Sequence, residues 1–282
     1  MIVFFGTSHH SAKFLELATK NGLKFDLVIS EPPKPLGRKQ ILTENPTISI
    51  AEKLNIPFLI HLEEILNFPS PTLGLILDFN KIIPQNTIDH FQKGIINIHF
   101  SKLPQYRGPA PVQYTILNGN KRAWITYYLI TQKVDGGPIL KQSSLPLEFT
   151  ETADSLYEKL IEKSAKEIPT IISAYLSDKD YPCQQTGIPS YTKKLTTDNC
   201  KIDWSKSPEE IERLIRAAYS EPGAWTEVKL QITNYKLQTK RLKILKAHLE
   251  KGNLVLDEVQ LEGKNPVSWA QFQEGYPEAK II

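Results

Sequence analysis

The chain has 282 residues, of which 40% are hydrophobic and 23% charged, and its net charge at pH 7 is +3. This composition is typical of an ordinary folded protein with one large or two modest domains, and it excludes a disordered or fibrous chain. No stretch approaches the roughly 20 apolar residues of a membrane helix, and the apolar run at 1–5 is too short for a signal peptide. The two cysteines lack metal-ligand spacing, so we expect reduced thiols in a cytoplasmic protein that holds no metal.

The first hundred residues alternate between patterns of strand and of helix. We expect strands at 1–5, 25–29, 58–60, 73–77 and 95–99, and helices after Ser8, at 48–54 and at 85–92. A strand, a helix and a strand within thirty residues predict a βαβ unit and therefore a mostly parallel sheet. After Gly6 no glycine follows until Gly22, so the G-x-G-x-x-G cradle of a dinucleotide site is missing.

The strand at 95–99 carries the most informative polar residues of the chain. Asn97 and His99 are two positions apart, and period-2 alternation places both side chains on one face of the strand. An imidazole can move a proton, and an amide can stabilise an oxyanion. This pair therefore predicts acyl-transfer chemistry, although a buried histidine with a purely structural role is the alternative.

A second candidate lies between two further strands, at 124–130 and 139–147. With no helix between them, these strands favour an antiparallel or mixed corner of the sheet, and the turn that joins them contains Asp135 followed by Gly136, Gly137 and Pro138. Asp-Gly is common turn chemistry. Beside His99, however, Asp135 could fix the imidazole tautomer and raise its basicity.

The rest of the chain predicts a second domain. A short helix is expected at 111–117 and a long one at 152–177, followed by a stretch with few apolar runs. Ser207, Pro208 and Glu210 form a helix start, and 225–261 reads as short β segments. We therefore expect a catalytic domain at 1–180, a linker at 181–200 and a small β-rich domain at 201–282.

Positive charge gathers in two stretches. Residues 229–251 hold seven lysines and arginines against one acid, Glu250, and the proline-rich segment 32–40 adds Lys34, Arg38 and Lys39 without an acid. Such stretches form either a solvated basic face or a surface that contacts a phosphate backbone. Composition alone does not separate these two interpretations.

The motifs resemble those of the 10-formyltetrahydrofolate-dependent formyltransferases over nearly the whole length. The resemblance rests on F-F-G-T at 4–7, P-K-P-L-G-R at 33–38, I-I-P at 82–84, N-I-H-F-S-K-L-P-Q-Y-R-G-P-A-P at 97–111, V-D-G-G-P at 134–138 and K-I-D-W at 201–204. Two differences stand out. Asp78-Phe79-Asn80 replaces an Ala-Tyr-Gly-like turn, and Lys102 stands where an apolar residue is usual.

The resemblance implies an α/β, Rossmann-like N-terminal formyltransferase domain and a C-terminal barrel of the OB type, here possibly shortened near 250–253. It implies that Asn97, His99 and Asp135 are catalytic, with 10-formyltetrahydrofolate as co-substrate and no metal. It assigns folate contacts to Ser101, Lys102, Leu103 and Pro104, and tRNA contacts to Lys34, Arg38 and Lys39. The expected reaction is formylation of the amino group of methionyl initiator tRNA by a monomeric protein that does not bind membranes.

Three alternatives remain open from the sequence. The same chemistry could act on an amino-sugar nucleotide, glycinamide ribonucleotide or another small amine, although such acceptors do not need two basic stretches. Hydrolysis of the formylfolate to formate would require water at the site. An RNA-binding protein without catalytic activity could also keep this scaffold, although the intact Asn97, His99 and Asp135 favour an enzyme.

Overall fold

The computed structural model describes residues 1–36, 41–43, 45–179, 181–233 and 236–282. The chain divides into two compact units. The first comprises residues 1–108, 123–145 and 157–191, and the second comprises residues 109–122, 146–156 and 192–282. Each unit thus draws on separate stretches of the chain, and the expected boundaries near 180 and 200 stay a prediction.

The first unit alternates strands and helices, as the sequence predicts. Its elements are β1 (Ile2–Phe5), α1 (His9–Lys20), β2 (Leu27–Ile29), β3 (Lys34–Leu36), β4 (Ile41–Thr43), α2 (Pro46–Lys53), β5 (Phe58–Leu59), the 3-10 helix η1 (Leu62–Asn67), β6 (Leu73–Ile76), α3 (Gln85–Asp89) and β7 (Ile95–His99), followed by most of β8 (Arg122–Leu129), β9 (Ile139–Pro146) and α5 (Ala153–Leu176). Ser8 caps α1 by accepting hydrogen bonds from backbone N–H groups of the first turn, which explains why the helix begins there.

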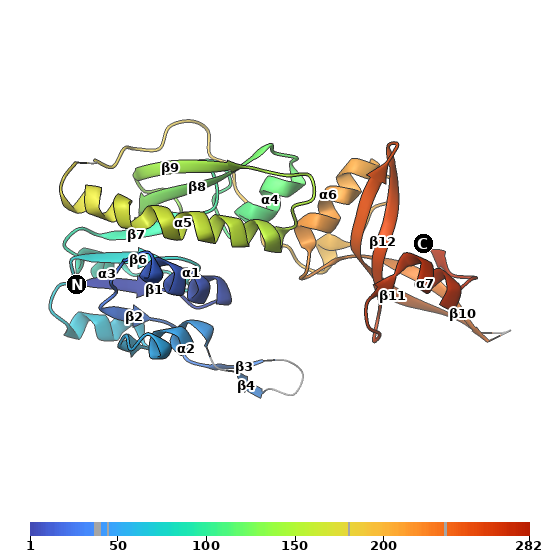
Figure 1. Ribbon diagram of the computed structural model, residues 1–282, viewed down its shortest axis with the longest axis horizontal. Helices are drawn as coiled ribbons and strands as arrows, with labels where there is room; N and C mark the ends of the chain where they lie inside the picture. Colours follow the sequence, from blue (N-terminus) through green and yellow to red (C-terminus); the bar gives the residue numbers. More distant parts are fainter. Residues whose placement is uncertain (37–40, 44, 180, 234–235) are drawn as a thin grey trace. The chain divides into compact units, whose positions relative to one another are not determined.

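A seven-stranded sheet organises the first unit, in the order β5-β2-β1-β6-β7-β8-β9 (Figure 1). The strands from β5 to β7 pair in parallel, and β8 pairs with β7 in the antiparallel direction. Parallel strands need crossover connections, which helices such as α1 supply, whereas β8 runs back along β7 in the antiparallel direction. The predicted α/β fold with an antiparallel corner is therefore confirmed.

Alternation along β1 shows how the sheet is covered on both faces. Phe4 stacks on Phe14 of α1, with ring centroids 5.7 Å apart, while Val3 and Phe5 join a buried cluster that includes Leu62 of η1. Ile95 of β7 belongs to the same cluster as Leu62, so Asn97 and His99 point to the same face as η1. The opposite face, toward α1 and α5, receives the even-numbered residues of β7.

The proline-rich basic segment contains a small hairpin that the sequence did not predict. β3 and β4 pair antiparallel, with Lys34 opposite Thr43.

The second unit combines helices with a five-stranded antiparallel sheet. It contains α4 (Pro111–Leu117), the 3-10 helix η2 (Asp198–Cys200), α6 (Pro208–Ala218), β10 (Ala224–Thr233), β11 (Lys236–Glu250), β12 (Asn253–Leu261), β13 (Val267–Ser268), α7 (Trp269–Gly275) and β14 (Lys280–Ile281). The sheet order is β13-β12-β11-β10-β14. The predicted cap of α6 is present as a reciprocal box between Ser207 and Glu210.

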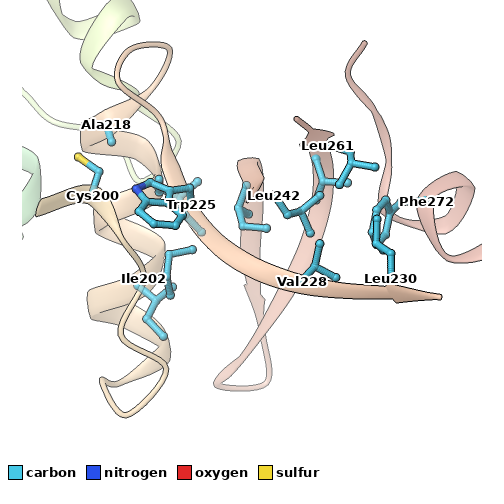
Figure 2. Close-up of a cluster of buried hydrophobic side chains, with 14 residues drawn as sticks. Cys200, Ile202, Ala218, Trp225, Val228, Leu230, Leu242, Leu261 and Phe272 are labelled. Carbon is cyan, nitrogen blue, oxygen red and sulfur yellow. The ribbon is translucent and has the colours of Figure 1, made fainter. Parts of the chain in front are cut away.

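A two-residue turn, Lys251-Gly252, joins β11 directly to β12, and both residues have positive φ, 49° and 82°. This is the conformation that matches the twist of paired strands, and it leaves no room for a further hairpin at 250–253. Between the sheet and its helices lies a buried apolar cluster (Figure 2). Figure 2 shows Trp225 near one end of the cluster and Phe272 near the other, with Leu242 between them.

Among the described residues, no helix is long and apolar enough to cross a membrane.

Candidate active site

Strand β7 presents Asn97 and His99 next to β8. In the antiparallel register Asn97 pairs with Tyr128 and His99 pairs with Thr126, so these four side chains share one face. His99 is only 7% exposed. The predicted placement of Asn97 and His99 on one face, at the carboxyl end of an inner strand, is therefore confirmed.

A backbone carbonyl sets the orientation of the His99 ring. Nε2 of His99 lies 2.9 Å from the carbonyl oxygen of Tyr106. A carbonyl oxygen can only accept, so Nε2 carries a proton and donates it. Nδ1 then faces Asp135, 3.9 Å from Oδ2, beyond hydrogen-bond distance but within the range of an ion pair. In this structure Tyr106, more than Asp135, orients the imidazole.

Asp135 occupies the turn between β8 and β9 with a left-handed backbone, φ 49°. Its Oδ2 accepts a 2.6 Å hydrogen bond from the backbone N–H of Gly108, and its Oδ1 accepts a 2.7 Å hydrogen bond from the phenol of Tyr128. Both oxygens of the carboxylate are thus held in place by hydrogen-bond donors. A Cβ at Gly137 would lie 1.7 Å from the carbonyl oxygen of Leu129, which explains why the turn requires glycine there.

Tyr128 connects the other two groups, and the sequence analysis did not single it out. Nδ2 of Asn97 donates a 2.8 Å hydrogen bond to the phenol oxygen, which in turn donates to Asp135. Burial, together with the nearby charge of Asp135, raises the pKa of Tyr128 well above its usual value. A tyrosine in a strand is normally read as core, and only the register between β7 and β8 reveals this role.

Gln185 holds the Asp135 turn from the segment that the sequence analysis assigned to the linker. Its Nε2 donates to the carbonyl oxygens of Asp135, at 2.9 Å, and of Gly137, at 2.8 Å. Its Oε1 accepts a hydrogen bond from the guanidinium of the buried Arg107. The catalytic loop after β7 and the Asp135 turn are therefore tied together by one side chain, and no sequence motif pointed to it.

The loop that was predicted to contact folate is firmly attached to the sheet. Ser101 and Leu103 are buried, whereas Lys102 is exposed and Pro104 half-buried. Thr126 donates to the carbonyl oxygen of Ser101 at 2.6 Å and accepts from the backbone N–H of Leu103 at 3.2 Å. The Lys102 ammonium lies 4.5 Å from the centre of the Trp124 ring, and this cation–π contact stabilises the charge that replaces the usual apolar residue.

The predicted tRNA contacts fall in the proline-rich basic segment at 32–40. Arg38 and Lys39 lie outside the described residues, as does the side chain of Lys34. These three assignments stay predictions.

Acidic side chains lie close to several cations of the second basic stretch, 229–251, and reduce its local charge. Lys243 pairs with Glu221 and Lys246 with Glu258, and His248 lies 2.9 Å from Asp257. Arg241 and Lys201 both lie over the ring of Trp225, at 4.2 and 5.2 Å. Acids from neighbouring segments thus offset part of the local charge of β11, which a count along the sequence does not detect.

The arrangement suits attack of an amine on an activated carbonyl carbon. An amide donor, an imidazole and a carboxylate meet on one face of the sheet beside β7 and β8, where charge on a carbonyl oxygen can be stabilised and a proton accepted. Among the described residues, no group of three histidine, cysteine, aspartate or glutamate side chains is placed to hold a metal ion.

Comparisons with known proteins agree with this chemistry. Residues 1–172 match the formyl transferase family, and residues 194–253 match the formyl transferase C-terminal domain. A methionyl-tRNA formyltransferase of Halalkalibacterium halodurans is 34% identical over 80% of this chain and 74% of its own length. One from Protochlamydia amoebophila is 28% identical over 97% of this chain and 94% of its own length.

A solved structure shows the same fold. The N-formyltransferase from Helicobacter canadensis, in complex with folinic acid and dTDP-3-aminofucose, superposes with a TM-score of 0.66 at 24% identity, covering 88% of this chain and 87% of the other. The family match spans well over half of the chain, and the relative from H. halodurans exceeds 30% identity. The chain therefore belongs to the formyl transferase family and catalyses formyl transfer.

Proposed function

We propose that this enzyme transfers the formyl group of 10-formyltetrahydrofolate to the amino group of methionyl initiator tRNA. The single observation that carries the proposal is the network of Asn97, His99 and Asp135 on one face of the sheet, in a chain whose relatives are named for this reaction.

In the proposed mechanism the amine of the aminoacyl group attacks the formyl carbon. Asn97 donates its second Nδ2 hydrogen to the formyl oxygen as charge develops there, and His99, which takes up the amine proton as the reaction proceeds, stabilises the same charge. The Asp135 carboxylate lies 3.9 Å from Nδ1 of His99, so it stabilises the imidazolium and helps to move the amine proton. The bond between the formyl carbon and N10 of the folate then breaks, the formyl group stays on the amine, and N10 takes up the proton that the amine has lost.

The loop at 101–104 is the proposed folate contact. Because Ser101 and Leu103 are turned inward, their role is to hold the loop, while Lys102 and Pro104 are the members that face outward. Gln142 reinforces the loop by donating to the carbonyl oxygen of Leu103 at 3.0 Å. A rigid wall next to the catalytic strand would position the formyl donor without reorganisation during the reaction.

The proposed tRNA contacts are Lys34, Arg38 and Lys39, together with the C-terminal domain at 201–282. Contacts to phosphates release counterions, so binding should weaken steeply as salt rises. We expect that replacing Arg38 and Lys39 with alanine reduces this salt dependence by about one to two units of slope. The double variant Lys20→Ala/Lys24→Ala, which removes equal charge elsewhere, is the control, and unchanged slopes in both would contradict the assignment.

An amino-sugar nucleotide is the second candidate acceptor, since a protein of the same fold from H. canadensis was crystallised with dTDP-3-aminofucose. The test offers purified enzyme 10-formyltetrahydrofolate with methionyl initiator tRNA, uncharged tRNA, an amino-sugar nucleotide or water alone. We expect transfer only to the charged tRNA. Formylation of the sugar but not of the tRNA would replace the proposed acceptor, and release of formate in water alone would indicate a hydrolase.

We also propose that the enzyme works as a cytoplasmic monomer. The proposed substrate is a tRNA used in translation, which supports the cytoplasmic location. The proposed reaction needs one active site and one tRNA, which supports the monomer. Sedimentation at micromolar concentration should give the mass of one chain, 32.1 kDa. A stable dimer would contradict this.

A further inference from the structure

Two tyrosines follow each other in β8 and face opposite sides of the sheet. Tyr127 and Tyr128 are 0% and 2% exposed, and each phenol binds a carboxylate. Tyr127 donates to Glu167 of α5 at 2.8 Å, on the face away from the catalytic residues. Tyr128 donates to Asp135 at 2.7 Å, inside the catalytic network. The two phenols are thus similarly buried and each donates to a carboxylate, but they lie on opposite faces of the sheet.

The direction of the hydrogen bonds through Tyr128 is determined by Asp135. An ionised carboxylate can only accept, so the phenol must give its proton to Oδ1 of Asp135. The phenol oxygen can then only accept from Asn97, and the amide atom that faces it must be the NH2 group. The bond from Nδ2 of Asn97 to this oxygen is 2.8 Å long.

Asn97 needs this direction for catalysis. In the observed orientation Nδ2 keeps a second hydrogen for the formyl oxygen. In the flipped orientation the amide would direct Oδ1 toward the phenol, whose one proton already serves Asp135. The flip would therefore leave two acceptors facing each other, which is unfavourable in a buried site.

We propose that Tyr128 is a positioning residue of the formyl-transfer reaction, which orients the Asn97 amide as a donor and holds one oxygen of Asp135. This inference rests on the proposed function of Asn97 and Asp135. Because burial and the charge of Asp135 raise the pKa of Tyr128, the phenol stays protonated and acts by its position. Nothing in the reaction requires it to touch the substrates.

The variant Tyr128→Phe tests the proposal, with Tyr127→Phe as its matched control. Both lose only a phenol oxygen next to a carboxylate, from a buried ring on one strand. For Tyr128→Phe we expect kcat to fall by about 10- to 100-fold, with KM for folate and for acceptor within about threefold of wild type. For Tyr127→Phe we expect a lower thermal midpoint and an unchanged kcat.

Separate values of kcat and KM distinguish positioning from a general loss of stability. The groups that contact the Asp135 carboxylate are the phenol of Tyr128 and the N–H of Gly108, with Nδ1 of His99 at 3.9 Å. Without the phenol the carboxylate loses one donor and the Asn97 amide loses its acceptor, so kcat per folded enzyme should fall. A loss of stability alone would reduce the amount of folded enzyme and leave that kcat unchanged. Equal kcat values per folded enzyme in the two variants would overturn the proposal.

A measurement without turnover distinguishes failure of this inference from failure of the proposed function. In spectra of uniformly ¹⁵N-labelled protein, the side-chain NH2 signals of Asn97 should shift in Tyr128→Phe and stay in place in Tyr127→Phe. Unshifted signals in Tyr128→Phe would exclude the hydrogen bond. If wild-type enzyme transfers no formyl group but the signals shift as expected, the network stands and the proposed reaction fails.

Discussion

Replacing Asp135 with asparagine is the most informative single change in the network. The variant keeps the shape of the side chain but removes its charge and turns one accepting oxygen into an NH2 group. Both oxygens of Asp135 face donors, from Tyr128 at 2.7 Å and from Gly108 at 2.6 Å, so one of these donors would meet another donor. The His99 imidazolium would lose the neighbouring negative charge at the same time.

The size of the effect follows from the distance between the two charges. At an effective dielectric constant of about 20, unit charges 3.9 Å apart interact by about 4 kcal/mol. This effective constant applies here because the two side chains are only 8% and 10% exposed, so solvent screens them little. In the proposed mechanism the imidazolium forms as the reaction proceeds, so a loss of about 4 kcal/mol lowers kcat by about 1,000-fold.

The assay is transfer of labelled formyl from 10-formyltetrahydrofolate to methionyl-tRNA at saturating concentrations of both. Asp257→Asn provides the control, because Asp257 also pairs with a histidine, His248 at 2.9 Å, but in the C-terminal sheet. We expect its kcat to equal that of wild type. A kcat of Asp135→Asn within about tenfold of wild type would refute the reasoning, since the charge would then supply less than about 1.4 kcal/mol.

Three further predictions concern packing, capping and thiol reactivity. Leu242→Ala, at a fully buried site of the C-terminal core, should lower the free energy of unfolding by about 3 kcal/mol in urea, whereas Leu249→Ala, 39% exposed on the same strand, should cost under about 1 kcal/mol. Ser207→Ala removes the cap of α6 and should cost about 1 kcal/mol by the same measurement; no loss would mean that the box is not formed. In a thiol titration of the native enzyme at pH 8, the exposed Cys183 should react, while burial raises the pKa of Cys200 to about 11 and should protect it until the protein is denatured; two fast thiols in the native state would contradict this.

The catalytic strand shows how far the sequence alone can lead. Alternation along residues 95–99 predicted that Asn97 and His99 share a face, and the structure confirms it, because the period of a strand is a local property. The motifs likewise predicted the α/β fold and the family. Asp135 could be nominated from its turn, but its distance from His99 depends on the antiparallel register of β8, which no local pattern contains.

The residues that the sequence analysis missed also depend on contacts between distant parts of the chain. Tyr128 and Gln185 enter the site through pairings across 31 and 50 residues, and both residue types are common in roles unrelated to catalysis. The charge of β11 was overestimated because its acidic partners, such as Glu221 and Glu258, come from other segments. Periodicity predicts which face a side chain takes, whereas only the tertiary fold determines which groups meet there.

The most direct test of the account follows a labelled formyl group from 10-formyltetrahydrofolate to the amine of methionyl initiator tRNA, with wild-type enzyme and with His99→Ala. The thermal midpoints of both proteins establish that the variant is folded. We predict that the wild type formylates the charged tRNA and that folded His99→Ala shows no transfer above background. Near-normal turnover by the folded variant, or no transfer by the wild type, would contradict the central claim that this network performs formyl transfer to methionyl-tRNA.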